Sequence, residues 1–280
     1  GGVVAAGPYE IGALSVGPLS TPALVVSGFN AAFLVAVAGA AISFGLIAVL
    51  IEDPERTESE AADEVSIRVR NPDGAGLDPV FALGLATIVM ALSIAIFAPL
   101  GNVVNEQLDQ GTFLFSVQFG ATVMANVAFQ TPLGRLSDRY GRRPFLLFGF
   151  VLLLPTTLAQ GFIPVLAAPF AGVPLLDPSG LMVLARFLQG VAVAAVFAPS
   201  LALAGDLAGE GQSGSTLSIL TMGFGLGVAF GTLFSGILVG FGFAVPFVVA
   251  TVGGAVGLYL VYTQVGETVE DAIAVPAVGD

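Results

Sequence analysis

The sequence predicts an all-α polytopic membrane protein, and three observations lead to that prediction. Apolar residues make up 56% of the 280 residues and charged residues only 10%, against about 45–50% and about 25% in soluble domains. Runs of about 20 apolar residues, each long enough to cross a bilayer as a helix, recur along most of the chain. Charged residues concentrate in the segments between these runs. We therefore expect about eight transmembrane helices.

The apolar runs divide the chain into a first part, a linker and a second part. We expect the end of one span over residues 1–17, a loop over 18–29 and a second span over 30–51. Residues 52–78 hold nine acids, three arginines and an Asn-Pro-Asp-Gly turn signal, which indicates a solvated linker. The six remaining spans are expected at about 80–100, 112–132, 144–166, 180–204, 214–240 and 243–264, and a tail follows over 266–280.

Composition excludes several classes of function. The chain has no cysteine and no histidine, so disulfides, thiol chemistry and the common metal sites are not expected. Its net charge of −12 argues against nucleic acid as a partner. No phosphate loop or nucleophile–histidine pair is present, so we expect neither an enzyme nor a bound cofactor. All eight basic residues are arginine, which indicates either a halophile or a GC-rich genome.

The arginines predict the orientation in the membrane, because loops rich in Lys and Arg stay on the cytoplasmic side. If the loop at 134–143 is cytoplasmic, alternation puts the linker 52–78, the loop 205–213 and the carboxyl terminus on the same side. The loops near 18–29, 101–111 and 167–179 then lie outside and hold no arginine. We expect a multi-pass protein of the cell (plasma) membrane. The loop arginines, all on the predicted cytoplasmic side, are Arg56, Arg68, Arg70, Arg135, Arg139, Arg142 and Arg143.

The 134–144 loop also carries a specific motif, Gly-x-x-x-Asp-Arg-x-Gly-Arg-Arg. A glycine lets two helix ends approach closely or allows a tight turn, and an aspartate can pair with the arginines or face a helix N-terminus. The motif resembles the signature loop of the major facilitator superfamily of transporters, in which it acts as a cytoplasmic latch. A plain positive-inside anchor is the alternative, but it would need only the arginines. The motif residues are Gly134, Asp138, Arg139, Gly141, Arg142 and Arg143.

The resemblance implies a bundle of two six-helix halves, of which this chain would hold about eight helices out of twelve. Residues 1–51 would be the last two helices of the first half, and 52–78 the acidic cytoplasmic linker. Residues 79–265 would form the second half, and 266–280 a cytoplasmic tail. The chain begins Gly-Gly inside an apolar run, so we expect an amino-terminal truncation.

Polar residues inside the expected spans are candidates for a substrate cavity. Arg186 and Gln189 resemble the family's Arg-x-x-Gln-Gly stretch, and an arginine in a span is costly unless it faces protein or water. Snorkelling of Arg186 to the outer surface remains an alternative. Gln118, Thr122, Asn126 and Gln130 recur at every fourth residue and so share one helix face. This stripe would face the cavity or join two helices.

Glu10 is a candidate proton carrier, because burial in a membrane favours the neutral form of a carboxylate. Its surroundings, Gly-Pro-Tyr-Glu-Ile-Gly, resemble the family's glycine–proline motif of the fifth helix, which is associated with antiporters. Val3 and Ile11 replace glycines of that motif. Small residues four apart also let helices pack closely. The expected packing glycines are Gly7, Gly12, Gly223, Gly227 and Gly231.

The resemblance implies a secondary active transporter of a small organic solute that works by alternating access on an ion gradient, with protons as the expected ion. The glycine–proline sequence favours efflux of a drug or metabolite by antiport. The alternatives are a symporter or uniporter for a nutrient such as a sugar or organic acid, a non-transporting membrane scaffold or sensor, and a fragment that does not transport alone. The expected partners are the lipid bilayer and the substrate, and the transporter is expected to be monomeric.

Overall fold

A computed structural model describes most of the chain, as two units that comprise residues 1–59 and 60–280. The residues described are 9–11, 15–16, 19–20, 24–26, 28–50, 69–71, 76–170, 172–173, 175–208 and 213–268. Most of the expected linker and the tail beyond residue 268 lie outside this set, as do the predicted packing glycines Gly7 and Gly12. The domain limits given above therefore stay predictions.

The first unit contains short strands and one long helix. Strand β1 (Tyr9–Ile11) pairs antiparallel with β4 (Leu24–Val26), and β2 (Ser15–Val16) pairs antiparallel with β3 (Leu19–Ser20). Helix α1 (Gly28–Leu50) lies within the run in which we predict a span.

The helix expected over residues 1–17 is wrong for the part of that segment that the structure describes. Strands β1 and β2 lie there instead, and Glu10 stands opposite Val25 in the β1–β4 pair. The sequence gives a physical reason. Gly7-Pro8 and Gly17-Pro18 bracket the segment with residues that break helices, and the β-branched Ile11 and Val16 favour extended backbone.

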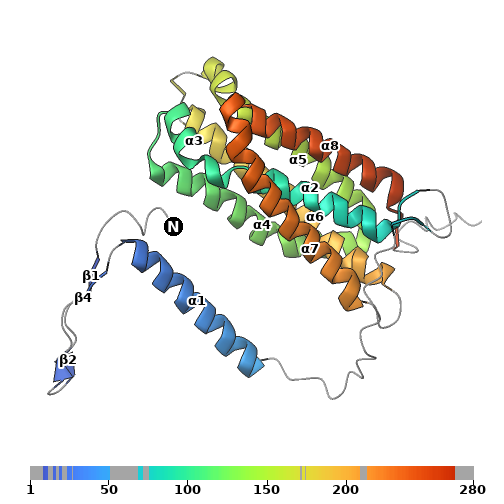
Figure 1. Cartoon of the computed structure of the whole chain (residues 1–280), viewed down its shortest axis with the longest axis horizontal. Helices are drawn as coiled ribbons and strands as arrows, with labels where there is room; N and C mark the ends of the chain where they lie inside the picture. The colour runs from blue at the N-terminus through green and yellow to red at the C-terminus, as the bar shows by residue number, and fades with distance from the viewer. Residues whose placement is uncertain are drawn as a thin grey trace, which may run out of the picture. The chain divides into compact units, whose positions relative to one another are not determined.

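The second unit is a helical bundle (Figure 1). Six of its helices match the six spans predicted after the linker. Together with α1, they make seven described helices that are long and apolar enough to cross a membrane, so the prediction of a membrane helical bundle is confirmed. The elements are α2 (Pro79–Ala95), η2 (Ala98–Leu100), α3 (Gly101–Gln107), α4 (Thr112–Tyr140), α5 (Arg142–Ala167), η3 (Ala168–Phe170), α6 (Pro178–Leu207), α7 (Ser213–Leu238), η4 (Val239–Phe241) and α8 (Val245–Gln264).

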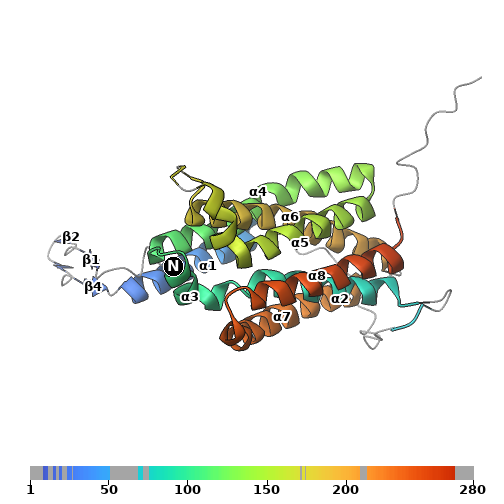
Figure 2. The same ribbon diagram turned by 90° about the horizontal axis from the view of Figure 1, so that it is seen from above.

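The bundle consists of two three-helix groups. Helix α6 packs against α4 and α5, whereas α2 packs against α7 and α8. Figure 2 shows the two groups side by side, with α5 and α8 at the contact between them. In chain order the long helices form two sets of three, α2, α4 and α5 and then α6, α7 and α8. The first helix of each set packs on the second and third helices of the other set. Helices α2 and α6 are therefore central in their groups, which we call the α2 group (α2, α7 and α8) and the α6 group (α4, α5 and α6).

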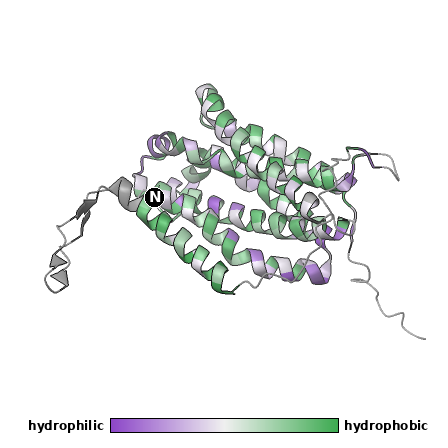
Figure 3. Cartoon of the chain, turned by 60° about the horizontal axis from the view of Figure 1, so that its bottom comes forward, coloured by the Kyte–Doolittle hydropathy of each residue, from purple (hydrophilic) through white to green (hydrophobic). Residues whose placement is uncertain are grey.

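Apolar residues occupy most of the length of the helices, and many of the hydrophilic residues lie towards the ends of the bundle (Figure 3). The interior is filled by two apolar clusters, one around Phe150 and Met90 and the other around Phe97 and Phe247. Many large apolar side chains on the outer faces of α4, α5, α7 and α8 stay exposed. A hydrocarbon solvent is the environment in which such a surface is stable.

Two loop limits differ from the prediction. The expected loop over 134–143 is almost all helix, because α4 continues to Tyr140, α5 begins at Arg142, and Gly141 alone is non-helical between them. Part of the expected outer loop over 101–111 is helix α3. Hydropathy marks where a membrane span ends, whereas a helix can continue into water as long as its residues allow helical backbone.

Candidate functional site

Arg186 lies at the centre of a buried polar cluster. Its side chain is 1% exposed, so it does not snorkel to the surface. Its Nη1 donates to Gln189 Oε1 at 2.5 Å, and the guanidinium carbon lies 4.2 Å from the centre of the Phe97 ring. The Nε atom has no partner among the described residues. The cation is thus held by an amide and an aromatic face.

Gln189 connects the cluster to both three-helix groups. Its Nε2 donates to the backbone oxygen of Ser93 on α2 and to Thr157 Oγ1 on α5, each at 3.0 Å. Because Gln189 is itself on α6 and fully buried, one amide ties three helices together. Arg186 and Gln189 are spaced by three residues, which puts them on one face of α6.

The amide stripe on α4 divides into two parts. Gln118 and Gln110 exchange two hydrogen bonds, of 2.7 and 3.0 Å, and Gln118 also donates to the backbone oxygen of Ser179 at 3.4 Å. Thr122 donates to the backbone oxygen of Arg186 at 2.9 Å. The first two residues of the stripe, Gln118 and Thr122, therefore join α4 to α6, as the helix-joining interpretation expects. Asn126 and Gln130, further along α4, are only half-buried.

The packing glycines of α7 lie against α2. A methyl group at Gly227 would overlap the backbone oxygen of Ile88, and one at Gly223 or Gly231 would come within 2.8 Å of a backbone oxygen of α2. In the other group, a methyl at Gly190 on α6 would overlap the backbone oxygen of Thr122 on α4. Glycine is thus required at both crossings because the helix backbones themselves are in contact.

The second polar site lies at one end of the bundle, where α4 turns into α5. Gly141 has φ +99°, a conformation that favours glycine, and a methyl group there would come 2.6 Å from Glu267 Oε2. We call this end, which carries Arg70, Arg135, Arg139, Arg142 and Arg143, the arginine-rich end. The tight turn expected at Gly141 is present.

Arg142 joins the turn to the last turn of α6. Its Nη1 lies 2.7 Å from Asp206 Oδ2, and its Nη2 lies 3.5 Å from Asp138 Oδ1. The pair with Asp206 is thus closer than the pair with the motif acid Asp138. Pairing of this kind depends on the packing of α5 on α6, and a sequence shows only that the acid and the arginine share one side of the membrane.

Glu267, which follows α8, caps the start of α5. Its carboxylate accepts hydrogen bonds from the backbone N–H groups of Arg142 and Arg143, both at 3.0 Å. Arg143 in turn donates through Nη2 to the backbone oxygen of Tyr262 at 2.7 Å. A carboxylate on the exposed N–H groups of a helix start is favourable. The sequence placed Glu267 in an acidic tail and gave no sign of this partner.

Two other motif residues make few contacts with the rest of the bundle. Gly134 lies inside α4, where a methyl group would make an ordinary contact of 3.6 Å with Ala198, so no close approach requires a glycine there. Arg139 is exposed, and its guanidinium carbon lies 5.4 Å from the ring centre of its neighbour Tyr140. The contacts of the motif are thus concentrated on Asp138, Gly141, Arg142 and Arg143.

A family model described as the Major Facilitator Superfamily matches residues 83–274, which is most of the described bundle. The chain belongs to this superfamily. It is also 27% identical, over 160 residues, to an uncharacterised MFS-type transporter of the fission yeast Schizosaccharomyces pombe. That alignment covers 57% of this chain and 32% of the yeast protein, so the chain spans well under two thirds of its relative. The resemblance read from the 134–144 motif is thereby confirmed, and this superfamily member is a multi-pass protein of a transporter family.

Proposed function

We propose that the protein is a secondary active transporter that moves a small organic solute by alternating access, in exchange for protons. The observation that supports this best is the Arg186 cluster. A buried cation in a membrane span costs several kcal/mol unless it is compensated, and here the compensation comes only from an amide and a ring among the described residues. A purely structural core would be more stable with an apolar side chain at this position.

The proton carrier in this proposal is a carboxylate outside the described bundle. The acids of its spans, Glu106, Asp138 and Asp206, all lie near helix ends. Glu10 is the candidate in this chain, although it lies in β1. The alignment covers only 32% of the yeast relative, and a carboxylate on a helix outside these 280 residues is the other candidate.

Transport of an organic anion by symport or uniport is the second candidate, and one observation favours it. Arg186 lacks a carboxylate partner among the described residues, and guanidinium groups recognise carboxylates through paired hydrogen bonds. A solute carboxylate could supply that partner. Proton antiport depends on the pH gradient, whereas uniport of an anion does not. Arg186→Lys keeps the positive charge but loses the planar pair of donors that a carboxylate binds, so it should weaken anion transport.

The test is transport by the full-length protein in proteoliposomes with an imposed pH gradient. We expect Arg186→Met to lower transport at least tenfold, whereas Arg135→Gln, which removes an exposed arginine that is not one of the motif residues, leaves it unchanged. Transport that persists after the gradient is collapsed contradicts proton antiport. Unchanged transport in Arg186→Met would remove the cluster from the mechanism and leave it as a helix-joining element.

We further propose that the arginine-rich end faces the cytoplasm of the cell membrane and that its contacts form a latch. Arg142 reaches acids on three segments there, the end of α4, the end of α6 and the segment after α8, so movement of these helices would break them. Orientation is testable directly, because the chain has no cysteine. A membrane-impermeant maleimide added to intact cells should label Val173→Cys and not Ser66→Cys, and the reverse pattern would invert the topology.

A further inference from the structure

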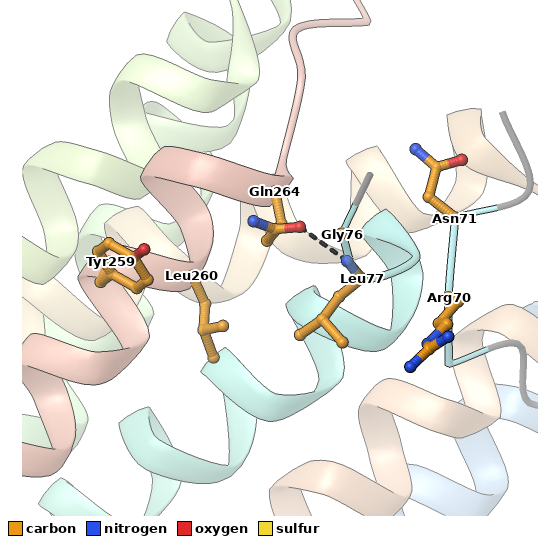
Figure 4. A pocket seen from close by; sticks show the side chains of 7 residues that line it. All are labelled: Arg70, Asn71, Gly76, Leu77, Tyr259, Leu260 and Gln264. Atoms are coloured by element: carbon orange, nitrogen blue, oxygen red, sulfur yellow. Dashed lines mark hydrogen bonds between the residues drawn. The ribbon is translucent and has the colours of Figure 1, made fainter. Parts of the chain in front are cut away.

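A cavity of about 560 Å³ opens at the arginine-rich end, where the segment before α2 meets the end of α8 (Figure 4). In Figure 4, Leu77 and Gln264 lie between Tyr259 on one side and Arg70 on the other. The cavity has both polar and apolar lining residues. It is lined by Arg70, Asn71, Gly76, Leu77, Tyr259, Leu260 and Gln264.

Hydrogen bonds fix the segment before α2, which forms one side of the cavity. The backbone N–H of Asn71 donates to Gly76 O at 3.2 Å, and that of Asp78 donates to Val69 O at 3.1 Å, so the segment folds back on itself. Leu77 N then donates to Gln264 Oε1 at 2.8 Å, which fastens the turn to α8. Gly76 has φ +130°, and a methyl group there would overlap Gln264 Oε1. The turn therefore fixes the backbone of Arg70 beside the end of α8.

An apolar groove of about 430 Å³ adjoins this cavity, and Tyr259 lines both. The groove lies between α5 and α8 on the outer face, and its walls are Leu147, Val151, Ala255, Leu258, Tyr259 and Tyr262. Val151, Tyr259 and Tyr262 are all more than half exposed. In a membrane protein such a face borders lipid, and tyrosines are enriched where the hydrocarbon meets the headgroups.

A second guanidinium borders the groove. The guanidinium carbon of Arg143 lies 5.6 Å from the ring centre of Tyr262. Among the described residues, the Arg70 side chain forms no ion pair with an acid. The combination is thus a cavity that carries the guanidinium of Arg70 and shares Tyr259 with an apolar groove along α5 and α8.

From this juxtaposition we infer that the cavity and groove together bind one anionic phospholipid. Arg70 and Gln264 bind the phosphate, since a guanidinium presents paired donors to phosphate oxygens. A hydrocarbon chain fills the groove along Val151 and Leu258. A free phosphate compound would use only the polar cavity, whereas the shared Tyr259 makes one amphiphilic molecule the better fit. Because α5, α8 and the linker meet here, the bound lipid holds the linker turn against the bundle.

The test is lipid retention by the full-length protein in detergent, measured by native mass spectrometry after addition of phosphatidylglycerol or phosphatidylcholine. We expect one retained phosphatidylglycerol, with about fivefold weaker binding in Arg70→Gln and no change in Arg135→Gln, an exposed arginine that lines neither space. Val151→Trp, which fills the groove at an exposed site, should weaken binding similarly.

Four outcomes would overturn the inference. The first is equal retention of the two lipids by the wild-type protein. The second is full displacement of phosphatidylglycerol by glycerol phosphate together with unaffected binding in Val151→Trp, which would mean a free anion site. The third is wild-type retention in Arg70→Gln. Occupation of the cavity by the acidic linker itself would be revealed by phosphatidylglycerol binding only after the acids of 52–64 are neutralised, and this result also contradicts the inference.

Discussion

The crossing of α2 with α7 and the crossing of α6 with α4 occupy equivalent places in the two three-helix groups, yet they are built from different side chains. At α2–α7 the described contact is mainly apolar, with Gly227 against the backbone of Ile88, and the buried hydroxyl of Ser235 donates to Ile96 O at 2.6 Å. At α6–α4 the same close approach occurs at Gly190, but Gln118 and Thr122 donate across it.

The difference shows that two equivalent helix crossings can be joined by different kinds of contact. Van der Waals contact of small residues is enough to join two helices in lipid, as the α2–α7 crossing demonstrates. The amides and the cation of the α6 group are therefore more than packing requires. They stand in the group that also contains Arg186, the one charged side chain that the structure places deep within a described span.

The largest effect is expected where the backbones touch. Gly227→Val should prevent the α2–α7 contact, because its side chain would overlap Ile88 O, and overpacking costs about 1–3 kcal/mol even where a core can adjust. Size-exclusion chromatography in detergent should show loss of the monodisperse protein. Gly225→Val is the matched control, since a methyl group at Gly225 meets nothing within 4 Å. Equal behaviour of the two variants would contradict the described crossing.

The next effect concerns the polar group. Gln189→Leu leaves Arg186 Nη1, Ser93 O and Thr157 Oγ1 without this partner, and a buried unsatisfied polar group costs about 1–3 kcal/mol, more when it is charged. We expect a thermal midpoint lower by several degrees.

Removal of the charge at the same time should restore part of that stability, because Arg186→Met/Gln189→Leu replaces a buried polar pair by apolar side chains. A double variant as unstable as the sum of the two single variants would show that Arg186 and Gln189 are not energetically coupled. Coupling would set the α6 group apart from the α2 group, where no such pair is described.

A smaller effect tests the amide stripe. Gln118→Leu removes three hydrogen bonds to Gln110 and Ser179 and should cost about 1–2 kcal/mol. Asn126→Leu, two turns away on the same face, alters a half-buried side chain with no described hydrogen bond and should stay within about 0.5 kcal/mol. Thermal unfolding of both variants in the same detergent measures the two losses of stability. A larger loss in Asn126→Leu than in Gln118→Leu would contradict the division of the stripe into a helix-joining part and a half-buried part.

The sequence predicts the parts of this structure that depend on solvent. The six spans of the bundle follow from apolar length, and the family follows from the spacing of Asp138, Gly141 and the arginines after it. The burial of Arg186 was left open between cavity and surface, because its position near a helix start allows both. The decision comes from Phe97 and Gln189, which only the packed bundle brings to the guanidinium.

The failures have a common physical cause. Hydropathy cannot show that α4 runs on to Tyr140, since charged residues in water are compatible with a helix. Asp206 and Glu267 could be assigned to the same side of the membrane as Arg142, but nothing in their local sequence selects one acid over another. The segment 1–17 is apolar enough for a span, yet its glycine–proline pairs allow the strands that the structure has.

The smallest effect concerns the way each group begins at the arginine-rich end. Helix α2 is capped locally, by Asp78 Oδ1 accepting from Val80 N at 2.9 Å, whereas α5 is capped by the distant Glu267. Glu267→Gln keeps an acceptor but loses the charge, so we expect a loss of about 0.5–1 kcal/mol that shrinks as salt rises. Glu106→Gln, which removes an equal charge from an exposed position at the opposite end of the bundle, is the control in the same thermal unfolding assay. Equal shifts in the two variants would mean that net charge, rather than the cap, holds the end of α8 to α5.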